Sequence, residues 1–151
     1  LGMQHSAASA LLDSAEAHYA SASVKALSAL AQNDATLFER LRALLAAHPD
    51  DADLLHSLGS WSRAAGNNDN AIGYWQRAIA QGGGVESWNQ LGQAHAGLSQ
   101  FEQAYIAENN ARRVLNGEAP LPMTGITLQQ RIAAEAVSEQ RNEHGIPWLP
   151  Q

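Results

Sequence analysis

The chain has 151 residues, of which 45% are hydrophobic and 6% aromatic, and its net charge is −6. That length suits one domain with a buried core, and the alanine-rich apolar set favours close packing of helix on helix without β-strands. The acidic balance argues against a nucleic-acid partner, and the lack of cysteine excludes disulfide bonds and thiolate metal ligands.

Residues 1–34 predict an alanine-rich N-terminal region of one or two helices, which we interpret as a degenerate repeat. Between residues 6 and 32, apolar residues from Leu11 onward recur at the four-residue spacing of a helical stripe. Ser21 and Ser23 can divide this helix in two, because serine side chains compete for backbone hydrogen bonds.

Residues 35–48 predict the next helix, whose leucines form one apolar stripe. Asp34 can cap its N-terminus, and Pro49 ends it because the residue before a proline disfavours helical geometry. The leucines of the stripe are Leu37, Leu41, Leu44 and Leu45.

An internal repeat follows and is the strongest signal in the chain. Leu58-Gly59 returns 33 positions later as Leu91-Gly92, and Ala71 returns at the same offset as Ala104. A fixed period of this length is typical of a solenoid of helical hairpins. The clearest copies span residues 52–84 and 85–117, within a repeat region of residues 35–117.

The pattern of each copy predicts two helices joined by a short turn. A turn at residues 66–69 divides the first copy, and the glycines at 82–84 separate the two copies. The expected helices span residues 52–65, 70–81, 85–96 and 100–115.

Residues 118–151 predict a loop, a C-terminal capping helix that ends near Glu143, and an apolar tail at 146–150. Pro120 and Pro122 block helix formation in the loop. The tail either folds back onto the last helices or docks into a partner.

The two copies resemble the tetratricopeptide repeat (TPR) family. Trp88, Leu91-Gly92 and Ala104 stand where that family has its Trp, Leu-Gly and central Ala, whereas Ser62 and His95 replace its Tyr. The resemblance implies an all-α, right-handed TPR-like helical-hairpin solenoid with a C-terminal capping helix. Such a fold is a surface for holding a partner.

A narrower resemblance covers residues 31–80 and 86–115. Their order of an Asn/Asp turn, a helix with paired leucines, a Pro-Asp turn and a Leu-Gly repeat is similar to the C-terminal repeats of the HemY family. These are bacterial membrane-anchored proteins associated with haem biosynthesis. The resemblance implies a scaffold near haem-pathway enzymes on the cytoplasmic face of the inner membrane, attached through a segment outside this chain. The periplasm is the alternative compartment.

By the TPR resemblance, the first helix of each hairpin lines a concave groove. Short polar and amide side chains in such a groove can hydrogen-bond a peptide, so we expect a protein or peptide partner. The alternative is a solvated helix face that binds nothing. The expected outward residues are Asp53, His56, Ser57, Ser60 and Arg63 in the first copy, and Glu86, Asn89, Gln90 and Gln93 in the second.

Other functions receive weaker signals. No catalytic frame surrounds the Ser, His and Asp residues, and no histidine pair has metal-site spacing, so we expect neither enzymatic activity nor a cofactor or metal. One rival is self-association through the helical region 6–32 or the tail around Trp148, which gives a homo-oligomer. A weaker rival is a haem carrier with His56 or His95 as axial ligand, the former also a groove residue and the latter a packing residue.

Overall fold

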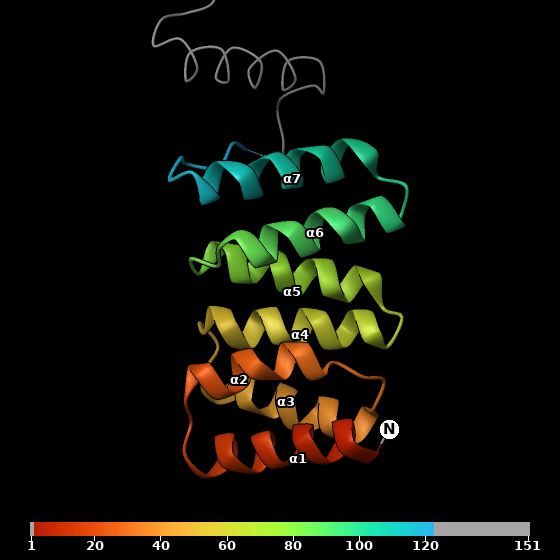
Figure 1. Ribbon diagram of the computed structural model, residues 1–151, viewed down its shortest axis with the longest axis vertical. Helices are drawn as coiled ribbons and strands as arrows, with labels where there is room; N and C mark the ends of the chain where they lie inside the picture. The colour runs from red at the N-terminus through yellow and green to blue at the C-terminus, as the bar shows by residue number, and fades with distance from the viewer. Residues whose placement is uncertain (1, 123–151) are drawn as a thin grey trace, which may run out of the picture.

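A computed structural model describes residues 2–122; the expected capping helix and apolar tail lie outside them. The described residues form an all-α protein of seven helices packed in sequential pairs (Figure 1). A single 3₁₀ turn, Ser28–Leu30, follows α2. The helices are α1 (Gly2–Ala17), α2 (Ser21–Leu27), α3 (Ala35–Ala47), α4 (Ala52–Ala64), α5 (Asn68–Ala80), α6 (Val85–Gly97) and α7 (Phe101–Leu115).

Side-chain caps set the starts of α3 and α5, and of α4 as described below. The Asp34 carboxylate accepts a hydrogen bond from the Leu37 amide at 3.0 Å and begins α3, as predicted. The Asn67 side chain accepts from the Asn70 amide at 3.1 Å and begins α5. The expected turn at residues 66–69 is therefore too long, because the cap at Asn67 starts α5 two residues earlier than predicted.

The helices lie one above another from α1 at one end to α7 at the other (Figure 1). Within the repeat region, α4 packs on α5 and α6 packs on α7, and α5 contacts α6. Contacts therefore run mainly between neighbouring helices, which is consistent with a helical-hairpin arrangement.

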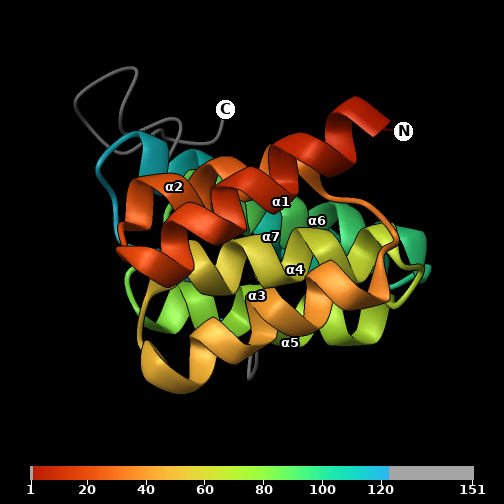
Figure 2. The ribbon, with the colours of Figure 1, turned by 90° about the horizontal axis from the view of Figure 1, so that it is seen from below.

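The N-terminal end is built differently. The predicted division of the first helix is confirmed, since α1 ends at Ala17 and α2 begins at Ser21. The helix α1 begins at Gly2 rather than near Ser6 and lies across this end of the molecule, in contact with both α2 and α3 (Figure 2). In the described chain α2 and α3 do not pack directly on each other, so they do not form a hairpin like α4–α5.

One carboxylate ties this N-terminal layer to the repeats. Asp51 caps α4 and also accepts hydrogen bonds from the Tyr19 hydroxyl, at 2.6 Å, and from Ser21. The Tyr19 ring stacks on His48 with 3.6 Å between ring centroids. Burial raises the pKa of Asp51, but the hydrogen bonds from Ser21, Tyr19 and the α4 backbone together lower it by more, and the net pKa lies below its ordinary value.

Most of the buried apolar side chains of residues 2–122 belong to two clusters. The first joins α1 to α4 through Leu12, Leu27, Leu41 and Trp61, and the second joins α5 to α7 around Trp75. Trp61 and Trp75 are fully buried, and each indole N–H has a backbone carbonyl acceptor. The two tryptophans therefore fill the space between helices without an unpaired polar group.

The leucine stripe of α3 is only partly buried. Leu37 and Leu41 are buried as predicted, whereas Leu44 and Leu45 are half-buried at the edge of the first cluster. The reason is that α3 contacts α1 and α4 but makes no direct contact with α2 within the described chain, which leaves part of its apolar face at the edge.

The repeated glycines stand where helices cross. A Cβ atom at Gly59 would lie 2.6 Å from Cε2 of Trp75, and one at Gly92 would lie 2.9 Å from Cγ of Glu108. Both separations are below ordinary contact distance. The recurrence of glycine at equivalent positions thus reflects the same close crossing of helices in both hairpins.

Candidate functional site

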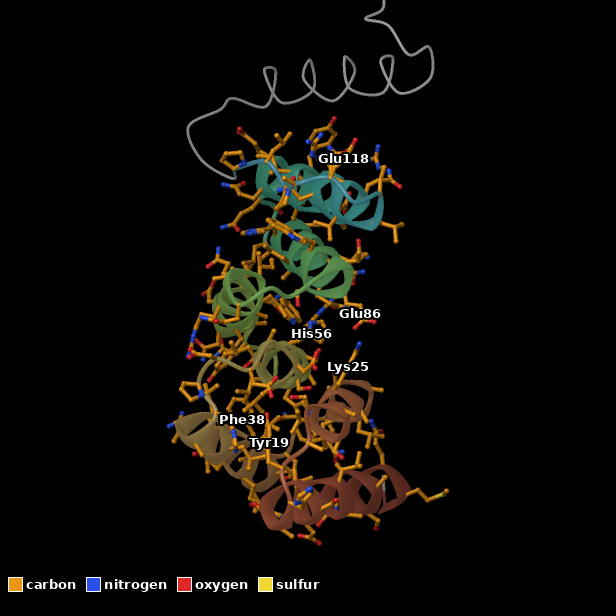
Figure 3. The ribbon with its side chains drawn as sticks, turned by 90° about the vertical axis from the view of Figure 1, so that its left-hand side faces the viewer. Tyr19, Lys25, Phe38, His56, Glu86 and Glu118 are labelled. Carbon is orange, nitrogen blue, oxygen red and sulfur yellow. The ribbon has the colours of Figure 1, made fainter. Side chains whose placement is uncertain are left out.

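The first helices of the two hairpins share one surface with α2. The helix α4 contacts α2 on one side and α6 on the other. Lys25 on α2, His56 on α4 and Glu86 on α6 follow one another along this side of the stack (Figure 3). We name this surface the α2–α4–α6 face; its residues are Lys25, Asp53, His56, Ser60, Arg63, Glu86, Asn89, Gln90 and Gln93.

Most of the residues expected to point outward are accessible. Arg63, Glu86, Asn89 and Gln93 are exposed. The remaining accessible members are half-buried; they are Asp53, Ser60 and Gln90. Polar side chains that a partner can reach are therefore present on both hairpins.

Two of the expected outward residues are buried, which corrects the expectation drawn from the TPR resemblance. Ser57 is fully buried, and its hydroxyl donates a hydrogen bond to the Val24 carbonyl of α2. His56 is only 8% exposed, because Ser87 and Glu86 of the next hairpin lie against its ring. Both side chains join neighbouring helices instead of facing solvent.

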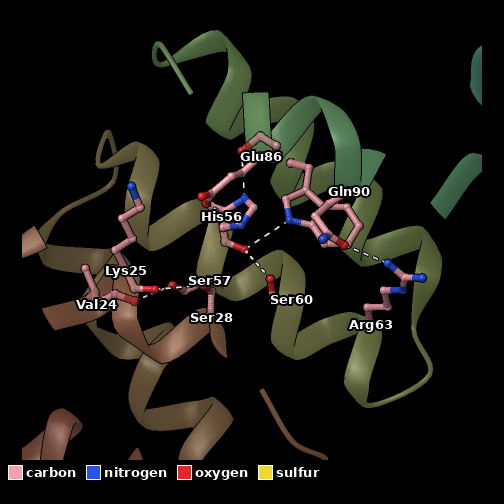
Figure 4. A network of polar contacts seen from close by, with 11 residues as sticks. Val24, Lys25, Ser28, His56, Ser57, Ser60, Arg63, Glu86 and Gln90 are labelled. Atoms are coloured by element: carbon pink, nitrogen blue, oxygen red, sulfur yellow. Dashed lines mark hydrogen bonds and ion pairs between the residues drawn. The ribbon is translucent and has the colours of Figure 1, made fainter. Parts of the chain in front are cut away.

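His56 is the centre of a set of polar contacts between α4, α5 and α6 (Figure 4). Its Nδ1 lies 2.9 Å from the Ser87 hydroxyl, and its Nε2 lies 3.9 Å from a Glu86 carboxylate oxygen. The His56 carbonyl accepts hydrogen bonds from Trp75 Nε1 at 3.2 Å and from the Ser60 hydroxyl at 3.3 Å. The position of His56 thus couples both hairpins.

Burial determines the charge of this imidazole. Desolvation lowers the pKa of His56, the carboxylates of Glu86 and Asp53 raise it, and Lys25 lowers it. The net pKa lies below the ordinary value for histidine, so the ring is neutral at pH 7. A neutral ring has one donor and one acceptor nitrogen, which suits the Ser87 hydroxyl in either orientation.

The structure brings three predicted site residues together. Arg63 Nη1 donates to Gln90 Oε1 at 2.8 Å and to Gln93 Oε1 at 3.0 Å. These bonds cross from α4 to α6 and hold the two glutamines in one orientation. Because Arg63 binds their oxygens, the amide NH₂ groups of Gln90 and Gln93 are the donors that a partner can use.

A pocket of about 260 Å³ opens beside His56 on this face. Asp53, His56, Glu86 and Ser87 line it together with Lys25, which comes from α2. The sequence did not single out Lys25 or Ser87. Lys25 lies before the recognisable repeat, and the first copy has an apolar leucine at the position equivalent to Ser87, so no pattern marked either residue.

His95 has a packing role, which confirms its interpretation from the sequence. It is 6% exposed, and its Nδ1 lies 2.7 Å from Gln100 Oε1. Within residues 2–122 no group of three or more His, Asp or Glu side chains is arranged to hold a metal ion. None of the helices described is long and apolar enough to cross a bilayer.

No protein-family model, no curated protein and no solved structure matches this chain. The contacts and exposed groups of the α2–α4–α6 face are therefore the observations that bear on function.

Proposed function

We propose that this chain is a non-catalytic scaffold that binds a protein or peptide partner on the α2–α4–α6 face. The observation that supports the proposal most is the continuity of polar side chains across two successive hairpins, with Arg63 fixing Gln90 and Gln93 in one orientation. These hydrogen bonds link the two hairpins at the surface and turn the Gln90 and Gln93 amide oxygens toward Arg63.

A peptide would be held by several weak contacts at once. Asn89 and Gln93 are exposed on α6; the Asn89 amide can donate to and accept from a peptide backbone, and the Gln93 NH₂ group can donate to it. Each such bond contributes only about 0.5–1.5 kcal/mol net, so one bond does not hold a peptide. The pocket beside His56, at about 260 Å³, is smaller than the roughly 300–1,000 Å³ of most ligand sites, which suits one side chain of the partner.

We further propose that the hairpins are tetratricopeptide-like repeats of a right-handed solenoid. The fixed period of the repeat and the matching close approaches at Gly59 and Gly92 support this assignment. The similarity to the HemY repeats extends the proposal to a membrane-associated bacterial assembly linked to haem biosynthesis.

The rival functions have less support. Ala8, Leu12 and Ala15 of α1 are buried within the chain itself and are not presented to a second copy. For a haem carrier, both ring nitrogens of His56 already face polar side chains, Ser87 and Glu86.

A paired set of variants tests partner binding. Asn89→Ala with Gln93→Ala removes exposed amides from α6, and Gln76→Ala with Gln103→Ala removes exposed amides from α5 and α7 as the matched control. With the chain as bait in a detergent extract of its source cells, the first pair should lose a protein that the wild type and the control pair retain. Equal retention by all three baits would contradict the proposal, provided that their melting temperatures agree.

A further inference from the structure

The pocket beside His56 has a charge pattern that narrows what can enter it. The charged and titratable side chains that line this cavity of about 260 Å³ are Lys25, Asp53, His56 and Glu86. Glu86 and Lys25 are exposed and Asp53 is half-buried, so all three charged side chains are accessible. The wall of the pocket therefore carries two negative side chains and one positive side chain.

The two carboxylates are not neutralised by a neighbouring side chain. Among residues 2–122 the Asp53 carboxylate has no ion pair, and a Glu86 carboxylate oxygen lies 3.9 Å from His56 Nε2. Because the imidazole is neutral at pH 7, this contact does not balance the charge of Glu86. A carboxylate beside a cavity is partly desolvated, and a cationic group with N–H donors stabilises it through charge-assisted hydrogen bonds.

The second nitrogen of the His56 ring is an unpaired polar atom in the same wall. His56 is only 8% exposed, and its Nδ1 lies 2.9 Å from the Ser87 hydroxyl. Its Nε2, by contrast, makes no hydrogen bond to the described residues and remains open to solvent. When Nδ1–H donates to Ser87, Nε2 is an acceptor. A group with several N–H donors can therefore satisfy Nε2 and a carboxylate together.

The charges around the ring favour a positive group. Desolvation is the largest influence on the pKa of His56 and lowers it; among the charged neighbours, Glu86 and Asp53 each raise this pKa by more than Lys25 lowers it. The charged side chains therefore create a net negative potential at the ring. An anion would depend instead on Lys25 and on the N-terminus of α6, whose partial positive charge is offset by Glu86 in its first turn.

We propose that the partner of the scaffold inserts a positively charged side chain, a lysine or an arginine, into the pocket beside His56, an inference that rests on the proposed function. Its charged group lies against Glu86 and Asp53, and one N–H is donated to His56 Nε2. Its aliphatic stem lies along Val85, an apolar part of the lining. Lys25 weakens this binding, because its ammonium group repels the incoming charge.

Titration of the full chain at pH 7 with three blocked amino acids tests this assignment, with backbone amide NMR shifts as the readout. The probes are Nα-acetyl-arginine amide, Nα-acetyl-citrulline amide, which has nearly the same shape without the charge, and Nα-acetyl-glutamate amide. We expect the arginine probe to shift the amides of Gly84, Val85 and Ser87 with saturation. It should bind about fivefold tighter than the citrulline probe, the gain of one accessible ion pair. The glutamate probe should not bind.

Single changes of charge separate the role of charge from that of shape. Glu86→Gln should reduce the preference for the arginine probe over the citrulline probe, whereas Lys25→Gln should increase it, because a repelling charge is lost. The control Glu102→Gln removes an exposed carboxylate from α7 and should behave as wild type. No saturable shift, equal binding of the arginine and citrulline probes, tighter binding of the glutamate probe, or an unchanged preference in Glu86→Gln would overturn the proposal.

The probe titration and the capture of a partner can fail independently. The probes require no partner, so loss of the partner in the Asn89/Gln93 pair without binding of the arginine probe would leave the scaffold function intact and reject the cationic occupant. Binding of the arginine probe with equal retention by all three baits would reject the scaffold function on this face instead.

Discussion

His56 shows how one side chain can belong to the interior and to a functional face together. Its ring is buried against Ser87, and its carbonyl accepts from Trp75 and Ser60, so its removal would disturb contacts among three helices. Its Nε2 side faces the pocket wall formed by Glu86. The imidazole therefore supports the surface that a partner would touch.

The burial of His56 predicts a pH dependence of stability. Because desolvation lowers the pKa of His56 in the folded state, the unfolded chain binds a proton more readily. The contribution of the neutral ring is fully present above the ordinary histidine pKa of about 6.5 and is lost as the pH falls below it. The free energy of unfolding from urea titrations should therefore decrease more between pH 8 and pH 5 for wild type than for His56→Gln. An equal or smaller decrease in wild type would contradict the assignment.

Single residues were predicted well where the cause is local. The cap at Asp34 follows from the sequence around it, and so does the division of the first helix before Ser21. The burial of His56 could not be predicted, because the groups that cover it come from α6, in the next hairpin. The Tyr19–Asp51 hydrogen bond likewise depends on the packing of the N-terminal layer.

At the scale of helices, the crossing of α4 and α5 depends on the absence of a side chain. Gly59 lies against the Trp75 indole, where even a Cβ atom would meet ring atoms. A tryptophan ring that is fully buried has no free space into which to move. A side chain added at Gly59 should therefore lower the stability of the protein more than one added at a solvated glycine within a helix.

Two alanine substitutions test this crossing. Gly59→Ala should lower the free energy of unfolding by about 1–3 kcal/mol, because the new methyl group overlaps the Trp75 ring. Gly73→Ala is the matched control, because no atom lies within 4 Å of its added Cβ; it should raise stability by about 0.5–1 kcal/mol through helix propensity. Urea unfolding measures both. Equal effects of the two substitutions would show that the crossing is not tightly packed.

The sequence was enough to predict that the repeat region is helical. It was not enough to predict how the helices at the N-terminal end pack on one another. The shared period identifies equivalent positions in α4–α5 and α6–α7, so each hairpin supports the prediction of the other. Residues 1–34 contain no second copy of this kind. Their sequence predicts helices, but it gives no sign that α1 contacts both α2 and α3 while these two remain apart.

Across the part of the chain that the structure describes there are two core clusters, and α1 belongs to the first of them. Leu12 is fully buried in this cluster, and α1 contacts α2 and α3, whereas Met3 on the same helix is 89% exposed. The buried face of α1 covers apolar side chains of α2 and α3 that would otherwise meet solvent. The helix is therefore part of the fold and not an appended segment.

Truncation of these two side chains tests the role of α1. Leu12→Ala should destabilise the chain by about 2–5 kcal/mol, because it leaves a cavity in the first cluster. Met3→Ala, on the same helix, should change the free energy of unfolding by less than about 0.5 kcal/mol. If both substitutions have the small effect in thermal or urea unfolding, α1 does not contribute to the core.

For the candidate face, the sequence predicted which polar side chains are present, but it did not predict which of them contact one another. It marked Arg63, Gln90 and Gln93 as polar groups on the first helices, and the structure joins them by hydrogen bonds. It did not mark Lys25, because α2 could not be aligned with the repeats. Contacts between successive hairpins depend on the rotation from one hairpin to the next, which a repeat period does not specify.

Site-specific photocrosslinking distinguishes a partner site on the α2–α4–α6 face from one elsewhere on the surface. A photoreactive amino acid replaces Gln93 on α6 in one chain and Gln76 on α5 in another; both positions are exposed. After irradiation in source cells, a covalent adduct with one defined partner protein should form from position 93 and none from position 76. An adduct at position 76 alone, or no adduct at position 93, would contradict partner binding on the α2–α4–α6 face.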